Sequence, residues 1–341
     1  MLIAVLKETT SQETRVALIP KHVAEFTSAN ITVRIEHLAG QKAGFSNQDY
    51  IKAGAEICAT AEETCKDADI ILKILAPSEN ELKLFKPHQT LICDTRNLNK
   101  QQLKIFSEAR INLFALDAIP RISRAQNMDI LSSQNNLSGY VAAILAATHA
   151  NAAIPLLMTS AGTLPAMKTL VIGLGVAGLQ AAATLHRLGA QVFAFDIRAE
   201  TEAQARSVGA VWINKITPEL LSATKIIITA AQTVGKPAPK LLNSQQLCRL
   251  PAYSVIVDLA ADTGGNIDTS NHPPTVKLIA DSHLARRIPY SASTLFSENL
   301  FNFCNLLIHD GELSPNFQDE IICATMMCCH KQSKNCFRHG E

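Results

Sequence analysis

The sequence lacks the features that mark several large protein classes. Its 31 Lys and Arg residues stand against 30 Asp and Glu residues in a chain of 341, so it offers no bulk positive field for nucleic acid or an anionic membrane. Its nine cysteines include no Cys-x-x-Cys pair, and Lys7 comes too early for a secretory leader. Serine-hydrolase GxSxG, zinc-protease HExxH and P-loop lysine motifs are also missing. These absences favour a cytosolic protein with reduced thiols.

A long segment between Asp129 and Lys168 contains no Asp, Glu, Lys or Arg. A membrane-spanning helix would need about 20 mostly apolar residues. This segment instead begins with the polar run SSQNNLSG and contains Pro155. We therefore expect a buried, close-packed helix from about Leu131 to Thr148 rather than a membrane span.

Apolar residues make up 47% of the chain and charged residues 18%, which is enough to bury large cores, and the length predicts two domains. The first third alternates short apolar strands with helices, as expected for an α/β domain with a parallel sheet. Strands are predicted at residues 2–7, 31–37, 68–75, 90–95 and 112–117, and helices at 20–30 and 49–57.

The middle of the chain predicts a doubly wound NAD-binding domain over residues 135–292. Its predicted strands cover residues 169–172, 191–196, 225–231, 254–260 and 277–281, and its predicted helices cover 176–189 and 200–209. A long amphipathic helix is expected from Thr294 to about Ile308, packed on the first domain. The fold class is therefore α/β, with two Rossmann-like domains. The second is inserted in a discontinuous first domain made of residues 1–134 and completed by 293–341.

A Gly-x-Gly-x-x-Gly motif formed by Gly173, Gly175 and Gly178 lies between a predicted strand and a predicted helix. The first glycine permits a tight turn, the second lets the backbone approach a pyrophosphate, and the third lets helix and strand pack closely. The helix N-terminus, which begins at Val176, would attract the phosphates. A glycine turn without any ligand is the alternative interpretation.

Asp196 ends the next strand, 18 residues past the last glycine. A carboxylate there accepts hydrogen bonds from the adenosine ribose hydroxyls and repels a 2′-phosphate, which favours NAD over NADP. We include Ile197 and Arg198 among the cofactor-binding residues. Arg198 could tolerate a 2′-phosphate, or it could be a solvent-exposed residue beside the adenine, and we prefer the second interpretation.

Five segments together resemble the NAD-binding component of the proton-translocating nicotinamide nucleotide transhydrogenase. They are ETRVALIP, PRISRAQNMDILSSQNNLSGY, VIGLGVAGLQAAATLHRLGAQVFAFDIR, GKPAPKLL and VIVDLAADTGGN. The resemblance runs from Met1 to about Thr325, and alanine dehydrogenase shares the same fold. It implies a homodimeric, NAD(H)-binding subunit that presents NADH for hydride transfer to NADP⁺. The partners would be NADP-binding and membrane-spanning subunits, which would place the chain in the cytoplasm, peripheral to the inner membrane.

The resemblance also implies a nicotinamide-binding loop. Arg121, Gln126 and Asp129 match family residues that contact the nicotinamide end of NAD, with Gln126 and Asp129 as the catalytic pair and Ser132 as a ribose contact. An amide side chain can fix the carboxamide by donating and accepting hydrogen bonds. Without the resemblance, the segment would be interpreted as a polar loop leading into a helix N-cap.

Alanine dehydrogenase is the alternative function, and a non-catalytic NAD-binding regulator is another. Arg15 matches the arginine that binds substrate in alanine dehydrogenases, but Leu75 and Arg96 stand where those enzymes have a lysine and a histidine. Asp262 favours alanine dehydrogenase, because the transhydrogenase component is expected to have an amide there. The chain also departs from the transhydrogenase pattern in having only NKITPELLSAT where a longer, mobile, Tyr-containing loop is expected.

The C-terminal region contains several cysteines and histidines, but their spacing matches no ordinary zinc site. We expect a reduced tail without a metal. The residues concerned are Cys323, Cys328, Cys329, His330, Cys336 and His339.

Overall fold

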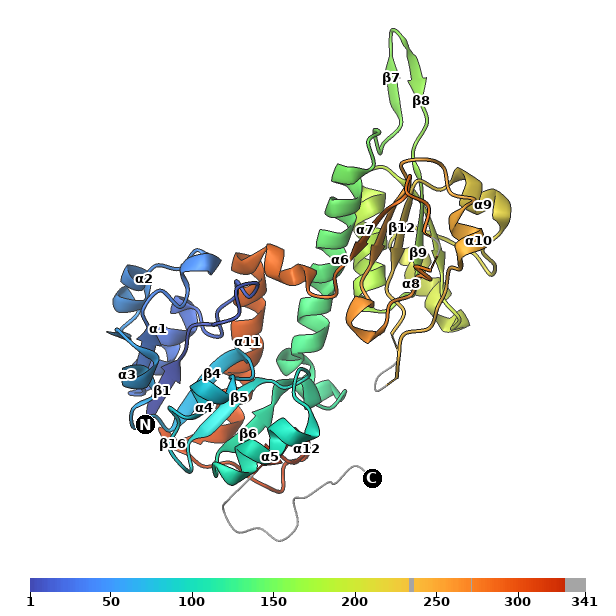
Figure 1. The fold of residues 1–341 in the computed structure, drawn as a ribbon. Coiled ribbons are helices and arrows are strands. Elements are labelled where there is room, and N and C mark those ends of the chain that lie inside the picture. The colour runs from blue at the N-terminus through green and yellow to red at the C-terminus, as the bar shows by residue number, and fades with distance from the viewer. Residues whose placement is uncertain (233–235, 271, 329–341) are drawn as a thin grey trace. The chain divides into compact units, whose positions relative to one another are not determined.

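The computed structural model describes residues 1–232, 236–270 and 272–328. Contacts within the chain divide it into two compact units, which are described separately. The first unit contains Met1–Gln134 and the described residues from Ile288 onward, and the second contains Asn135–Arg287. Each unit has a mainly parallel sheet covered by helices (Figure 1), which confirms the predicted fold class of two Rossmann-like units.

The sheet of the first unit has the strand order β17-β6-β5-β4-β1-β2-β3. All neighbours are parallel except β17, which pairs antiparallel with β6 at the edge. The order reverses between β1 and β4, which is the switch point of a doubly wound fold. The strands are β1 (Leu2–Val5), β2 (Thr32–Glu36), β3 (Glu56–Cys58), β4 (Ile70–Leu75), β5 (Thr90–Asp94), β6 (Asn112–Ala115) and β17 (Met326–Cys328).

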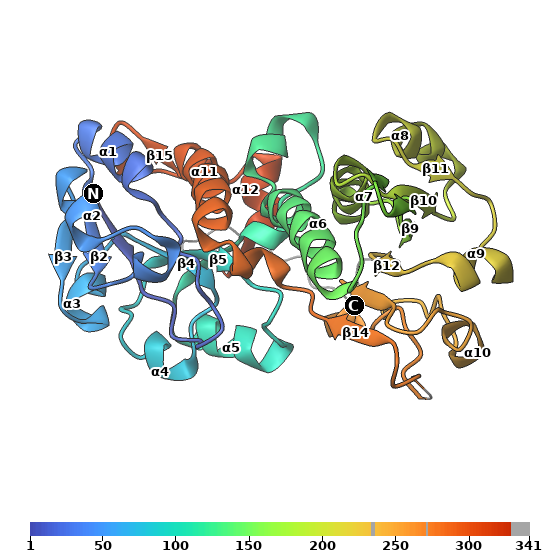
Figure 2. The same ribbon diagram turned by 90° about the horizontal axis from the view of Figure 1, so that it is seen from above.

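Helices cover both faces of this sheet, with α11 on the opposite side from α4 and α5 (Figure 2). The α-helices that begin in this unit are α1 (Pro20–Ser28), α2 (Asn47–Lys52), α3 (Ala61–Cys65), α4 (Glu79–Leu82), α5 (Lys100–Glu108), α6 (Ile130–His149), α11 (Pro289–Leu307) and α12 (Glu320–Thr325). Short 3-10 turns occur at Gln41–Ala43, Leu116–Ala118 and Ser123–Met128, and strands β15 (Ile308–His309) and β16 (Glu312–Leu313) form a small hairpin.

The predicted helix over residues 49–57 is wrong in its second half. Helix α2 ends at Lys52, and Gly54 adopts a left-handed backbone with φ of 93°. The chain then turns into β3, where Glu56 lies opposite Arg34 of β2. Glycine ends the helix there because it adopts positive φ at little steric cost.

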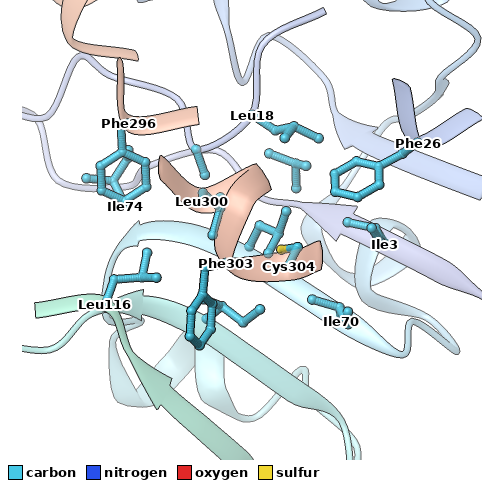
Figure 3. Close-up of a cluster of buried hydrophobic side chains, with 14 of the residues drawn as sticks. Ile3, Leu18, Phe26, Ile70, Ile74, Leu116, Phe296, Leu300, Phe303 and Cys304 are labelled. Carbon is cyan, nitrogen blue, oxygen red and sulfur yellow. The ribbon is translucent and has the colours of Figure 1, made fainter. Parts of the chain in front are cut away.

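Helix α11 supplies a large part of the core on one face of the first sheet (Figure 3). Phe296, Leu300 and Phe303 are buried against strand residues that include Ile3 and Ile70. The helix begins at Pro289, earlier than the predicted Thr294, because proline fits the first helical position, where its missing N–H has no partner to lose.

The sheet of the second unit has the order β11-β10-β9-β12-β13-β14, and every neighbouring pair is parallel. The strands are β9 (Lys168–Ile172), β10 (Gln191–Phe195), β11 (Val211–Trp212), β12 (Ile226–Thr229), β13 (Val255–Asp258) and β14 (Lys277–Ala280). The α-helices are α7 (Val176–Arg187), α8 (Glu202–Ser207), α9 (Pro218–Ala223) and α10 (Ser244–Leu247), with 3-10 turns at Ala199–Thr201, Ala261–Thr263 and Leu284–Arg287.

The second unit also contains a β-hairpin that the sequence does not predict. Strands β7 (Leu157–Thr159) and β8 (Gly162–Leu164) pair antiparallel, and all six of their residues are exposed. The hairpin belongs to the uncharged segment, where the apolar residues follow no clear strand period.

The expected buried helix of the uncharged segment is α6, which runs over Ile130–His149. Gly139 allows this helix close contact, since a Cβ atom there would overlap the Ala177 carbonyl oxygen of α7. Among the described residues, no helix combines the length and apolar character that crossing a membrane requires.

The first unit buries a cluster of three charged side chains beneath its sheet edge. The ammonium group of Lys73, on β4, lies 2.8 Å from a Glu81 carboxylate oxygen and 3.6 Å from one of Glu8. Lys73 is 1% exposed. Burial raises the pKa of Glu8 to about 6, from an ordinary value of 4.5. Although burial opposes the charge of Lys73, the two glutamates hold its pKa above the ordinary value.

We expect Lys73→Met to destabilise the protein by about 3–5 kcal/mol at pH 7.5, because it leaves buried carboxylates without a cation. The loss should be smaller at pH 5. Without Lys73, the pKa of Glu8 in the folded state rises further, while the unfolded carboxyl keeps its ordinary pKa. Between these values the folded protein binds a proton that the unfolded chain releases, so stability falls as pH increases. Urea unfolding at both pH values measures the difference.

Lys86→Met is the matched control, since Lys86 forms a 2.6 Å ion pair with Asp67 at an exposed site. It should leave the melting temperature nearly unchanged. A Lys73→Met variant as stable as the parent at pH 7.5 would contradict the assigned role of this cluster.

Candidate functional site

The glycine turn between β9 and α7 is held tightly at its first and third glycines. Gly173 has φ of 92°, and a Cβ atom there would lie 2.7 Å from the Ala231 amide nitrogen. A Cβ atom on Gly178 would overlap the Gly173 carbonyl oxygen. Both neighbours are backbone atoms, so larger residues at Gly173 or Gly178 would displace α7 or the chain after β12.

The second glycine of the turn faces open space. No heavy atom of the described residues lies within 4 Å of a Cβ atom built on Gly175. Gly175 is also the N-cap of α7, whose first residue, Val176, is 41% exposed. Backbone N–H groups at such a helix N-terminus attract an anion. The turn therefore has room for a phosphate group where the sequence predicts one.

Asp196 ends β10 and is nearly buried, at 9% exposed. One carboxylate oxygen accepts hydrogen bonds from the Leu174 amide at 2.7 Å and from the Arg198 guanidinium at 2.9 Å. The other accepts from the amide and the Nε of Arg198 at 2.9 and 3.0 Å. Burial opposes ionisation, but the hydrogen bonds from Arg198 and Leu174 hold the pKa of Asp196 below its ordinary value.

Arg198 thus has a role that neither interpretation from the sequence anticipates. Its guanidinium group lies on the Asp196 carboxylate while half of the side chain remains exposed. Ile197, between the two, is 89% exposed. An exposed apolar side chain beside a nucleotide site offers a flat contact for an adenine ring.

Sequence reasoning missed Asn266, which organises the loops after β12 and β13. Its fully buried side chain accepts a hydrogen bond from the Ala231 amide at 3.1 Å and donates to the Ala231 and Pro239 carbonyl oxygens at 2.9 Å. The Asp258 carboxylate in turn accepts from the Asn266 amide at 2.7 Å. An asparagine after two glycines at a strand end was the available signal.

Asp262, the residue that favours alanine dehydrogenase, lies in the turn after β13. Its carboxylate is 2.5 Å from His283 Nε2, and both side chains are about half exposed. Its amide also donates to the Ser282 hydroxyl at 3.1 Å. This pairing joins the loops after β13 and β14 at the surface of the second unit.

The segment NKITPELLSAT, where a longer loop is expected from the family pattern, is compact. Thr217 caps α9, and Leu221 of this helix is buried in the core of the second unit. A structured helix replaces the expected mobile loop.

The predicted nicotinamide-binding residues all lie in the first unit. Gln126 is exposed and belongs to the 3-10 turn Ser123–Met128, and Arg121 is exposed just before it. Asp129 follows the turn in an extended conformation. Its carboxylate accepts hydrogen bonds from the Ser132 amide at 2.9 Å and the Ser132 hydroxyl at 2.6 Å. Asp129 therefore caps α6, and Ser132 lies in the first turn of that helix.

Two contacts anchor this loop to the rest of its unit. Arg124 makes a bidentate pair with Asp319, with N–O distances of 2.6 and 2.9 Å. The Asn299 side chain of α11 donates to the Asn127 carbonyl oxygen at 2.8 Å. Gln126 therefore projects from a fixed loop rather than from a loose one.

The side chains that match the alanine dehydrogenase substrate site are already paired. The Arg15 guanidinium is buried and binds both Glu13 oxygens at 2.7 Å and the Gln134 amide oxygen at 2.9 Å. Arg96 makes a similar pair with Asp94, at 2.7 Å. Leu75, at the end of β4, brings no cation.

The cysteine-rich C-terminus is described only up to β17. Cys323 is exposed and Cys328 is buried in β17, whereas Cys329, His330, Cys336 and His339 lie outside the described residues. In the portion of the chain that the structure describes, no group of three or more potential metal ligands occurs.

Two family models cover nearly the whole chain. The alanine dehydrogenase/PNT N-terminal domain matches residues 4–138, and the alanine dehydrogenase/PNT C-terminal domain matches residues 142–335.

Individual relatives come from both branches of this family. The chain is 35% identical to an NAD(P) transhydrogenase subunit alpha chain of Rickettsia prowazekii, over 94% of this chain and 93% of the relative. The crystal structure of a transhydrogenase from Sinorhizobium meliloti superposes with a TM-score of 0.91 at 36% identity, and the match covers 96% and 99% of the two chains. An alanine dehydrogenase from Methanococcus maripaludis is 29% identical over 79% of this chain and 74% of the relative.

Proposed function

The chain belongs to the alanine dehydrogenase/PNT family, and within it we propose that this protein is the NAD(H)-binding subunit of a proton-translocating NAD(P) transhydrogenase. The observation that carries the proposal is the glycine turn, which is closed by backbone at Gly173 and Gly178 and open at Gly175. Its transhydrogenase relatives of about 35% identity support the same assignment.

In this proposal the glycine turn binds the pyrophosphate of NAD, and Asp196 binds the adenosine ribose. Gly175 provides the space, and the N–H groups at the start of α7 provide the attraction. A carboxylate at Asp196 favours NAD over NADP, because a 2′-phosphate would meet a negative charge. Val176 and Ile197 lie beside these groups and supply apolar contacts.

Alanine dehydrogenase is the less favoured function, for a reason that the structure adds. Three N–H donors of Arg15 are engaged by Glu13 and Gln134, and Glu13 cancels its charge. A substrate carboxylate would have to displace a carboxylate that belongs to the protein. Together with Leu75 and Arg96, this argues against an amino-acid substrate in the first unit.

Hydride transfer between two nicotinamides needs positioning rather than a covalent or acid–base step in this subunit. We assign that positioning to Gln126 and Asp129, with Arg121 and Ser132 as further NAD contacts. The exposed Gln126 amide can donate to and accept from the carboxamide. Asp129 fixes the loop through its cap on α6, and the anchors at Arg124 and Asn127 keep the loop in place.

The remaining elements of the proposal concern partners. NADP would be bound by a separate subunit and protons carried by a membrane-spanning one, which places this chain on the cytoplasmic side of the inner membrane. The hairpin β7–β8 supports a homodimer, since Met158 is 75% and Leu164 54% exposed. An isolated two-stranded hairpin is marginally stable in water, and a second copy of the chain would cover it.

We expect Gly175→Ala to weaken NADH binding at least tenfold while changing the free energy of unfolding by less than about 1 kcal/mol. The added methyl group meets no protein atom of the described chain but fills the space assigned to the pyrophosphate. Gly178→Ala is the contrasting variant, because its methyl group collides with backbone and should cost about 1–3 kcal/mol of stability. NADH fluorescence titration and urea unfolding measure the two effects. Full NADH affinity in Gly175→Ala would remove the proposed pyrophosphate site.

Gln126→Asn should reduce hydride transfer at least tenfold and change NADH binding by less than about 1 kcal/mol. The variant keeps the amide but shortens its reach, and a misplacement of about 1 Å can cost about a hundredfold in rate. The assay is transhydrogenation with an NADP-binding partner, beside NADH titration.

Gln101→Asn, on the exposed surface of α5, is the matched control and should transfer hydride normally. Unchanged transfer in both Gln126→Asn and Asp129→Asn would return the segment to a polar loop ahead of a helix. Turnover with alanine and NAD⁺ would favour alanine dehydrogenase, and NADH binding without any transfer would favour the regulator.

The homodimer is tested by light scattering of the purified chain. We expect a dimer mass for the parent and a dissociation constant at least tenfold higher for Leu164→Asp, because a carboxylate would be buried in the interface. Ile51→Asp, at an exposed apolar residue of α2, should leave the mass unchanged. A monomeric parent protein would exclude this role for the hairpin.

A further inference from the structure

The Asp196 carboxylate is fully occupied by hydrogen bonds from its own chain. Its two oxygens together accept from the Leu174 amide, the Arg198 amide, and the Nε and Nη2 atoms of Arg198, all at 2.7–3.0 Å. A carboxylate offers about four lone-pair sites in all. A ribose diol therefore finds no acceptor site on Asp196 while Arg198 stays in place.

The four donors fall into two kinds. The Leu174 and Arg198 amides belong to the backbone and are fixed by the turn and by the end of β10. The guanidinium donors belong to a side chain that is 51% exposed and can rotate into solvent. If it rotates, one acceptor site opens on each oxygen, because Nε binds one oxygen and Nη2 binds the other. Two sites on two oxygens match the two hydroxyl groups of a ribose.

We propose that Arg198 competes with the adenosine ribose for Asp196, so that NADH binding requires the guanidinium to leave the carboxylate. This inference rests on the proposed function, in which Asp196 binds the ribose. Arg198 is then a specificity-determining residue whose presence lowers the affinity for NADH.

The displaced guanidinium also determines how the site responds to a 2′-phosphate. A 2′-phosphate lacks the hydroxyl donor at that position and carries negative charge, so it would pair with Arg198 instead. Arg198 therefore offsets some of the repulsion from Asp196. Removing the guanidinium should strengthen NADH binding and weaken NADPH binding together.

The test is Arg198→Met, which keeps an apolar stem and removes every donor of the side chain. By fluorescence titration, we expect the dissociation constant of NADH to fall at least threefold and that of NADPH to rise at least threefold. Arg198→Lys keeps the charge but cannot form the planar fork. It should tighten NADH binding while leaving NADPH affinity within twofold of the parent.

The first unit supplies a matched control. Arg96 follows Asp94 at the same two-residue spacing, and its amide, Nε and Nη2 bind that carboxylate at 2.7–3.1 Å. Arg96→Met thus breaks the same kind of pair at the end of β5, in the unit that does not contain the glycine turn. Both dissociation constants should stay within twofold of the parent.

Each outcome decides between distinct explanations. Weaker NADH binding in Arg198→Met, or an unchanged ratio of NADH to NADPH affinity, would overturn the competition. If Arg198→Met does not fold, as judged by circular dichroism, Arg198→Lys decides by whether its NADH affinity increases. A parent protein that binds neither nucleotide would instead contradict the proposed function itself.

Discussion

Three backbone segments meet at Gly173, and the second unit depends on that contact. The chain after β12 lies against Gly173 at Ala231, and α7 lies against it at Gly178. Because the contacts are between backbone atoms, neither segment can approach closer or adapt by changing a rotamer. Asn266 fixes Ala231 from the other side through two hydrogen bonds, and Leu174 ties the turn to Asp196. The result is a rigid turn with one open position, at Gly175.

The two units share a strand order but not the chemistry of their sheet edges. In the first unit, charged side chains near the ends of the strands pair with one another, as in the cluster around Lys73 and the pair of Arg15 with Glu13. Buried charges are tolerated only when they are paired, so these groups have little capacity left for a substrate. In the second unit the edge offers backbone N–H groups and open space. One fold therefore supports two different roles.

The same contrast is consistent with an activity that depends on orientation. A subunit that only presents a nicotinamide needs a firm loop with an exposed polar side chain, and it needs no acid or base. The loop that carries Gln126 has this character, since Arg124 and Asn127 connect it to α12 and α11. Its fixed position would limit the freedom of the ring, which is where positioning contributes to the rate.

The sequence by itself determined the α/β class, most strands, the long helices and the glycine turn, because apolar periods and glycine positions are local signals. It also carried the family resemblance, and the match of both family models agrees with it. The tertiary structure decided which groups pair. Arg15 meets Gln134 and Lys73 meets Glu8 across long stretches of chain, and β17 joins the sheet edge beside β6. Even Asp196 and Arg198, two residues apart, formed a pair that the sequence left open, because the direction of a flexible side chain depends on the backbone that packing imposes.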